Sequence, residues 1–323
     1  MSNAVIPSQL FLEQNNATIG RNIARLVLLL QNWQRKSVDL RGKNDKETKA
    51  NINKWLDDFE QIYAGNISDI TVLYGIQGFT GINMEVSDQG GTVREDVSRG
   101  TYLALYQQRS EQMRGKILTE ARALRNYLAR NWRGKSNQFY TAYDEFVKEA
   151  NALGIPLREQ VNKFLALPLN KDYTYTPDRQ RRFGIKTKGG LWRPDAYGSM
   201  YARTRGREIE DIVRMDETRE LGLNIVQISN ANTTTPICLK YEGKYFYVDS
   251  PVNGLQKLPI RPPFHPNCVH RILPVVRDQQ EKFLRTNRSK DAKYRSKAKS
   301  FTAGQKRSVN KQESWNLENR IQV

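Results

Sequence analysis

Apolar residues recur at helical spacing through much of the first half of the chain. Two such runs lie on either side of a polar turn around Gly42, so residues 18–64 predict a helical hairpin. Asp45 can cap the second of its helices by accepting a backbone N–H. The apolar faces of the two helices would consist of Ile19, Ile23, Leu26, Val27, Leu30, Ile52, Trp55, Leu56, Phe59 and Ile62.

A glycine-rich stretch and a long amphipathic helix follow. Residues 75–92 contain five glycines and no sustained period, which predicts a loop or a small irregular segment. From about Val93 to Trp132 the spacing predicts one long helix, whose apolar stripe consists of Tyr106, Met113, Ile117, Ala121, Leu124, Leu128 and Trp132. The opposite face is basic and faces either solvent or a partner such as nucleic acid; it carries Arg109, Arg114, Lys116, Arg122, Arg125 and Arg130. Two shorter helices are predicted at residues 137–151 and from about Pro156 to Leu165.

The second half of the chain combines a helix with short strands. The segment 167–193 is rich in proline, glycine and charge, which is typical of a linker. Pro194 is predicted to begin a helix that runs to about Leu221 and is closed by Gly222. A small sheet is predicted from three β-rich runs, at residues 224–230, 241–248 and 270–276.

The chain becomes strongly basic after Val276. Thirteen Lys or Arg and five Asp or Glu lie between Arg277 and Val323, with few apolar residues, which predicts a disordered or loosely helical tail. Its spaced charges suit contact with a nucleic-acid backbone, and a solubilising tail without a partner is the alternative. The candidate nucleic-acid contacts are Lys282, Arg285, Arg288, Lys290, Lys293, Arg295, Lys297, Lys299, Lys306 and Arg307.

These patterns together predict an α+β fold in four parts. A mainly helical N-terminal half at residues 1–166 is followed by a linker at 167–193, a small α+β domain with a short β-sheet at 194–276, and the basic tail at 277–323.

The charge of the whole chain indicates a polyanionic partner. Its 323 residues carry a formal net charge of +18, which favours nucleic acid first and a membrane surface second. We expect no membrane segment, because the most apolar stretch, at residues 26–30, is too short to span a bilayer. The N-terminus lacks signal-peptide features, and two cysteines do not form a disulfide scaffold, so we expect a soluble chain made in a reducing cytoplasm.

Every imidazole and thiol of the chain falls within a short stretch of sequence. Cys238 is followed by His265, Cys268 and His270, which together form a Cys2His2 set of metal ligands. A turn between His265 and Cys268 would bring these two residues together. The spacing H-x2-C-x-H differs from that of common zinc knuckles. Three interpretations therefore stay open: a structural zinc site, side chains that pack the loop without a metal, and a Cys238–Cys268 disulfide formed after cell lysis.

Separated motifs in this half resemble a known family. The passage TTTPICLKYEGKYF is followed, about thirty residues after Cys238, by RPPFHPNCVHRI, and GGLWRPDAYGSMYARTRGREI precedes both. They resemble the C-terminal signature of tailed-phage minor head proteins, namely the Mu F-like head-morphogenesis proteins and the minor capsid protein 2 group. The resemblance is carried by Gly190, Trp192, Tyr197, Met200, Arg203, Thr204, Gly243, Pro262, Pro263 and Asn267. Val269 and His270 depart from it, because an arginine and a second cysteine are usual there.

The resemblance implies a structural role in a virion. Proteins of this family are low-copy head components near the portal, which are made in the host cytoplasm and stay inside the head with the DNA. The implied partners are the portal protein, the major capsid protein and packaged double-stranded DNA, in a ring or multi-copy assembly at the portal. The implied role is in head assembly, DNA packaging or ejection. The only cofactor that the sequence suggests is the structural zinc.

Catalytic patterns are weak by comparison. The sequence has no G-x-x-x-x-G-K-[ST], G-x-S-x-G or G-x-G-x-x-G motif. Glu208 and Glu210 match the E-x-E element of ADP-ribosyltransferases, but a charged helix produces this pattern by chance. If both histidines bind zinc, none is left as a general base. We therefore expect no enzyme, and the alternative is a nuclease-like DNA-processing metalloenzyme or a cellular DNA-binding protein.

Overall fold

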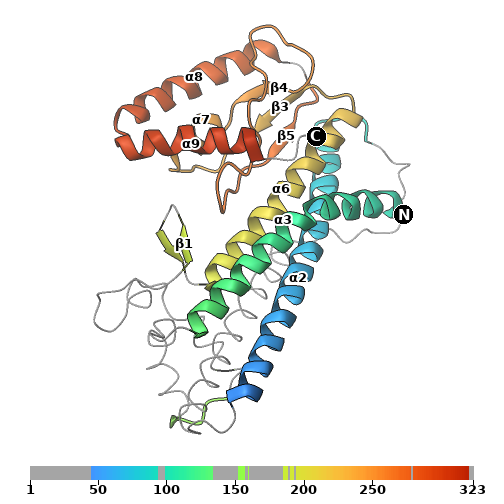
Figure 1. Ribbon diagram of the computed structural model, residues 1–323. Coiled ribbons are helices and arrows are strands. Elements are labelled where there is room, and N and C mark those ends of the chain that lie inside the picture. Colours follow the sequence, from blue (N-terminus) through green and yellow to red (C-terminus); the bar gives the residue numbers. More distant parts are fainter. Residues whose placement is uncertain are drawn as a thin grey trace. The chain divides into compact units, whose positions relative to one another are not determined.

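The computed structural model is mostly helical, with a small three-stranded antiparallel sheet in its C-terminal part (Figure 1). The predicted α+β class is thereby confirmed. The structure describes residues 45–93, 99–133, 152–156, 159, 185–187, 190–192, 194–277 and 279–319. The first helix of the predicted hairpin, the helix at 137–151 and most of the helix after Pro156 lie outside these residues. Among the described helices, none is both long and apolar enough to cross a membrane.

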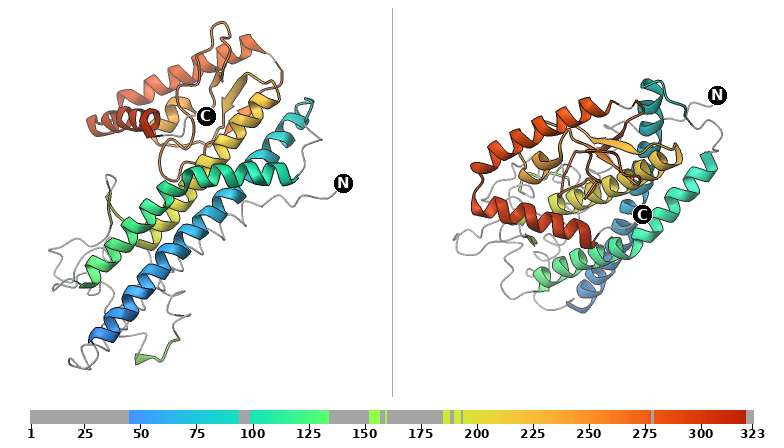
Figure 2. Two further views of the ribbon diagram at one scale, coloured as in Figure 1. Left: turned by 45° about the vertical axis from the view of Figure 1, so that its right-hand side comes forward. Right: turned by 90° about the horizontal axis from the view of Figure 1, so that it is seen from above.

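The chain forms two compact units. Of the described residues, unit 1 comprises those between 71 and 110 and those from 203 onward. Unit 2 comprises the described residues between 45 and 70 and between 111 and 202. Three long helices contribute residues to both units and are shown from two sides in Figure 2: α2 (Asp45–Asp88), α3 (Arg99–Arg133) and α6 (Pro194–Glu220).

In unit 2 the predicted apolar stripe of α3 is confirmed where the structure describes it. Its buried members are Met113, Ile117, Ala121 and Leu124. On α2 the placement of Ile62 in the apolar face is wrong, because this side chain is 55% exposed. The buried face passes instead from Leu56 and Phe59 to Tyr63 and Ile67. With 3.6 residues per turn, these four positions fall on one side of α2, whereas Ile62 lies about 100° from their centre.

Two hydrogen bonds and a pair of short strands are further features of the described part of unit 2. The Tyr63 hydroxyl donates to the Gly198 carbonyl at 3.4 Å, and the Tyr201 hydroxyl donates to the Lys116 carbonyl at 3.1 Å. Strands β1 (Ile185–Thr187) and β2 (Gly190–Trp192) pair antiparallel. The stretch predicted to be a linker therefore contains a β-hairpin.

The glycine-rich part of α2 is helical to its end, so the loop predicted at residues 75–92 is wrong over most of its length. The glycines allow close packing in unit 1. A Cβ at Gly78 would lie 2.7 Å from the backbone oxygen of Glu210, and one at Gly206 would lie 2.1 Å from the Tyr74 ring. A helical glycine costs about 1 kcal/mol relative to alanine, and the close contact between α2 and α6 offsets that cost.

Buried charges of α6 hold unit 1 together. Arg214 is 1% exposed; its Nε donates to the Ile272 carbonyl at 2.7 Å, and its guanidinium pairs with Glu85 of α2. Arg271 lies 2.9 Å from Glu210. Buried guanidinium groups need such partners because losing water without compensation is costly. Within unit 1, these contacts fix α2 and the segment at Arg271 and Ile272 against α6.

Three short strands form the sheet of unit 1. Strand β3 (Ile225–Ile228) is central and pairs antiparallel with β4 (Tyr245–Tyr247) and β5 (Ile272–Pro274). Each strand lies within one of the predicted β-rich runs. The short helix α7 (Pro236–Tyr241), between β3 and β4, was missed. The core around the sheet includes Val226, Ile228, Ile237, Phe246, Ile260, Phe264 and Ile272.

Side-chain amides cover both edges of this sheet. Beside β5, Gln89 donates to the Pro274 carbonyl at 2.9 Å and accepts from the Val276 N–H at 3.0 Å. Beside β4, Asn287 accepts from the Tyr245 N–H at 2.8 Å and donates to the Tyr245 carbonyl at 2.8 Å. An uncovered edge strand invites pairing with another chain, and these amides occupy the groups that such pairing would use.

The basic segment after Val276 forms two packed helices, so of the two predicted states the helical one is confirmed and the disordered one is wrong. Helices α8 (Gln280–Lys299) and α9 (Ala303–Asn319) both contact α7 (Figure 1). The Phe283 ring of α8 stacks on Tyr245 with centroids 4.4 Å apart, and Val309 of α9 lies in the main core. A few apolar residues suffice because each reaches the core of the existing sheet.

Candidate metal centre

Cys238 lies in the interior of unit 1 because α7 carries it there. Pro236 occupies the first turn of this helix, where its missing N–H breaks no helical hydrogen bond. Glu242 ends the helix and donates its N–H to the Cys238 carbonyl at 2.8 Å. The Cys238 side chain is fully buried, in the same cluster as Phe264 and Cys268.

His265 and Cys268 lie on a tight turn, as predicted. The Cys268 N–H donates to the His265 carbonyl at 3.1 Å. Asn267 has a φ of +62°, a left-handed conformation that asparagine tolerates better than most residues. Arg203 of α6 donates to Asn267 Oδ1 at 2.7 Å and holds the turn in place.

Three of the four predicted ligands converge. The ligand atoms of Cys238, His265 and Cys268 all lie within 4.8 Å of one another. The two sulfurs are 3.9 Å apart, and His265 Nε2 lies 3.0 Å from Cys238 Sγ. Tetrahedral zinc with Zn–S bonds of about 2.3 Å separates two sulfurs by about 3.8 Å. The cysteines, which are both free thiols, therefore have the spacing of two ligands to one metal.

His270 contacts Cys268 but is not one of the three residues whose ligand atoms converge. Its Nδ1 lies 3.5 Å from Cys268 Sγ. Its Nε2 is buried, has no hydrogen-bond partner among the described residues, and lies 3.8 Å from Glu242 Oε2. A histidine that binds a metal through one ring nitrogen usually gives the other to a carboxylate or carbonyl. The orientation of His270, between a thiol and a carboxylate, fits that arrangement.

Glu242 is a residue of the site that the sequence analysis missed. Its carboxylate accepts the N–H groups of Ala231 at 2.6 Å, Asn232 at 2.5 Å and Thr233 at 3.4 Å. Three such donors compensate a buried carboxylate for its lost water. The feature of the sequence that could have pointed to Glu242 is its position directly before Gly243, the glycine of the turn.

The two thiols titrate as a pair, and Cys268 gives up its proton more easily. Its hydrogen bond with Cys238 lowers the pKa of Cys268 to about 4; His270 and His265 act in the same direction, and burial opposes them. The same hydrogen bond, together with burial, raises the pKa of Cys238. One thiolate is thus favoured near neutral pH, and a bound cation would favour a second. The cluster is a candidate metal-binding group with donors that suit zinc.

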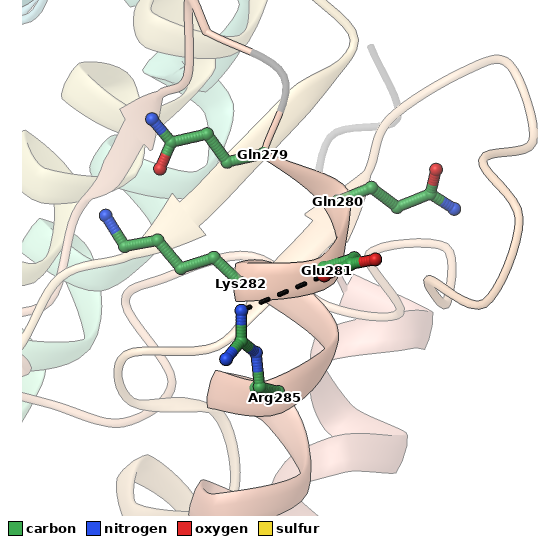
Figure 3. A pocket seen from close by; sticks show the side chains of 5 residues that line it. All are labelled: Gln279, Gln280, Glu281, Lys282 and Arg285. Atoms are coloured by element: carbon green, nitrogen blue, oxygen red, sulfur yellow. Dashed lines mark ion pairs between the residues drawn. The ribbon is translucent and has the colours of Figure 1, made fainter.

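The ten predicted nucleic-acid contacts lie on α8 and α9 rather than on an extended tail. Eight of them lie on α8, and Lys306 and Arg307 lie on α9. Figure 3 shows Lys282 and Arg285 in a shallow hollow at the start of α8, where Arg285 lies 3.9 Å from Glu281. Both members of that pair are largely exposed, which makes it weak.

The basic face of α3 has carboxylate partners within unit 2. Arg122 lies 3.3 Å from Glu60, and Arg125 pairs with Asp57. Arg114 pairs with Glu111 of its own helix at 2.9 Å. The side chains of Arg109 and Arg130 lie outside the description. The described arginines of this face are therefore partly neutralised, which makes them weaker candidates for nucleic acid.

The residues behind the family resemblance occupy structural positions. Gly243 has a φ of +72°, and a Cβ there would lie 2.4 Å from Asn230 Oδ1, so the turn before β4 requires glycine. The helix part of the motif contributes Arg203, whose contact with Asn267 joins it to the loop part. Met200, Pro262 and Pro263 are buried, whereas Tyr197 and Thr204 are half-buried. The Trp192 side chain lies outside the description.

Comparison with known proteins adds nothing to this site. No family model, no curated protein and no solved structure matches the chain. The candidate function therefore rests on the residues and on their geometry.

Proposed function

We propose that this chain is a structural minor head protein of a tailed phage. In this proposal a zinc ion holds the loop that carries His265 and Cys268, and the basic helices α8 and α9 contact packaged DNA. The observation that supports it best is the meeting of three separated motif elements. Arg203 of the helix element binds Asn267 of the loop element, and Cys268 of that loop lies 3.9 Å from Cys238 of the TTTPIC element. Residues that resemble one family signature thus form one contiguous site.

A structural zinc suits the character of this site better than a catalytic one. Cys238 and Cys268 would bind the metal as thiolates and His265 through Nε2, and His270 Nδ1 is the proposed fourth donor. Four protein donors leave no position for a reacting water. Cys238, Cys268 and His270 are each at most 3% exposed, which suits a metal that stabilises the fold. A nuclease would need an open position on its metal.

The net charge of the chain supports a proposed non-specific contact with DNA. A formal charge of +18 favours a polyanion, because neutralising phosphates releases counterions from DNA. Ordered lysines on α8 suit contact with a phosphate backbone and carry no base readout. The proposed protein partners are the portal and major capsid proteins, with the chain made in the host cytoplasm and then held inside the head near the portal, in a ring or another multi-copy assembly.

This proposal is tested by mass spectrometry of purified virions of the phage whose genome encodes the chain. We expect the chain at low copy, protected from added protease in full heads and digested once the heads are opened. Crosslinks to the portal protein would identify its position. Its absence from particles would contradict the proposal, and metal-dependent cleavage of DNA by the purified chain would favour the nuclease alternative.

A further inference from the structure

A second site in unit 1 is built mainly from lysines instead of the thiols and imidazoles of the metal group. The loop at 232–234 and one face of α8 enclose a cavity of about 150 Å³, into which Lys290, Lys293 and Lys297 project from α8. We infer that this cavity binds a phosphate group. The inference rests on the proposed function only in taking the DNA backbone as the source of that phosphate.

The three lysines share one face of α8. They are spaced by three and four residues, which places successive side chains one above another along a helix. Ammonium groups that line one small cavity repel one another, because like charges raise each other's electrostatic energy. An anion in the cavity would relieve this repulsion and gain the attraction of all three charges.

The ammonium groups keep most of their hydrogen-bonding capacity. Lys290 donates to Asn230 Oδ1 at 2.7 Å, which leaves two of its three donors. Within the described part of the chain, no carboxylate pairs with Lys293 or Lys297, and both side chains are exposed. Asp291, the acid next to Lys290 in the sequence, is engaged by Lys244.

The carboxylate in the cavity lining does not neutralise these lysines. Glu242 already accepts three backbone N–H groups from the loop at 231–233, which compensates its charge locally. The same bonds hold the loop at the mouth of the cavity. Thr233 Oγ1 accepts the Thr235 N–H at 3.1 Å, so its hydroxyl hydrogen remains available to a ligand.

Phosphate fits this donor set better than a carboxylate does. Lysines act as point charges from several directions, which suits a tetrahedral anion, whereas a planar carboxylate favours the fork of an arginine. The cavity offers no wall of aromatic rings on which a base could stack. Tyr294 is the aromatic residue of the lining, and its ring meets Phe301 edge-on at 6.0 Å. The site therefore suits a phosphodiester or free phosphate without sequence preference.

The test compares two charge-matched double variants of the full chain. One is Lys293→Gln with Lys297→Gln, in the cavity; the control is Lys257→Gln with Lys311→Gln, two exposed lysines outside its lining and outside the predicted nucleic-acid contacts. Binding of a short labelled DNA duplex is measured by fluorescence anisotropy across a salt series. Stabilisation by inorganic phosphate is measured separately as a shift in Tm. A Lys293→Arg, Lys297→Arg variant, which keeps the charge, checks that any loss does not come from misfolding.

We expect the cavity variant to lose about tenfold in DNA affinity for each phosphate contact removed, with a salt slope smaller by about 0.9 per contact. Its phosphate-induced Tm shift should also disappear, while the control and the arginine variant keep both properties. If the cavity variant matches the control in both assays, the phosphate site is wrong and the proposed function is untouched. If phosphate binding is lost as expected but the unaltered chain does not bind DNA, the site stands and the DNA part of the proposed function fails.

Discussion

The metal group and the lysine cavity share one residue, Glu242, and differ in almost every other physical property. In the metal group, two buried thiols and one half-buried imidazole converge, and the buried His270 lies beside Cys268. In the cavity, the charged ends of Lys293 and Lys297 stay exposed to water. A structural metal repays the burial of its donors by forming bonds to them. A polyanion gains more from charges that remain solvated until it arrives.

This difference separates the effects expected from substitution. Changes in the buried group should alter the free energy of unfolding, since a bound metal adds its binding energy to the folded state. Changes in the cavity should alter affinity for a polyanion and leave unfolding nearly unchanged. The following experiments test whether effects on unfolding and effects on polyanion affinity separate in this way.

Chelation of zinc should have the largest effect. At a free zinc concentration about 1,000 times Kd, the metal contributes about 4 kcal/mol of stability, and a chelator should remove it. Urea unfolding with and without chelator measures the change. A Cys238→Ser variant should be insensitive to the chelator, while Lys293→Gln should respond like the unaltered chain. Equal unfolding curves with and without chelator would show that no metal stabilises the fold.

Glu242→Gln should come next, because it disturbs the residue shared by both sites. Replacing one oxygen by an NH2 group leaves part-buried loop N–H donors without an acceptor, at a cost of about 1–3 kcal/mol. If His270 binds zinc, its loss of a carboxylate partner should also weaken zinc binding by about 10–100-fold. Competition with a zinc-sensing dye measures this. Glu281→Gln, at a site whose side chain is 94% exposed, is the control. An unchanged zinc affinity would exclude His270 as a ligand supported by Glu242.

Gly78→Ala tests the close packing between α2 and α6 within unit 1. The new Cβ would meet the Glu210 backbone, which cannot rotate away, so we expect a loss of about 1–3 kcal/mol. Gly65→Ala, on the same helix, has open space around it and should stabilise the chain by about 1 kcal/mol through helix propensity. Thermal unfolding of the two variants should therefore shift in opposite directions. Shifts of the same sign would mean that α2 and α6 do not approach as closely as described.

The smallest effect is expected from Arg122→Gln combined with Arg125→Gln on α3. These arginines already face Glu60 and Asp57, so removing them should change DNA affinity by less than about twofold. The anisotropy assay used for the lysine cavity measures it. A loss as large as that of the cavity variant would show that paired and unpaired basic faces bind DNA alike.

Much of the chain from Pro194 onward could be predicted because its signals are local. Pro194 and Gly222 mark the ends of α6, and each strand carries its own run of β-forming residues. The metal group could be predicted because histidine and cysteine are so rare in this chain that their clustering stands out.

The errors concern properties that depend on a distant partner. The glycines at 75–92 indicate a loop until α6 is present, because only close packing against another helix makes them favourable. The basic C-terminal segment has too few apolar residues to fold alone, yet Phe283 and Val309 find their core on the sheet. Glu242 becomes part of the site only through a loop turn and a histidine that lie elsewhere in the sequence.

Elemental analysis of the purified chain by mass spectrometry tests the central claim most directly, with a Cys268→Ser variant analysed beside it. The account predicts about one zinc per chain, lost from the variant together with a fall in Tm. A chain that holds no zinc after purification in zinc-containing medium, and whose Tm does not depend on zinc, would contradict the claim.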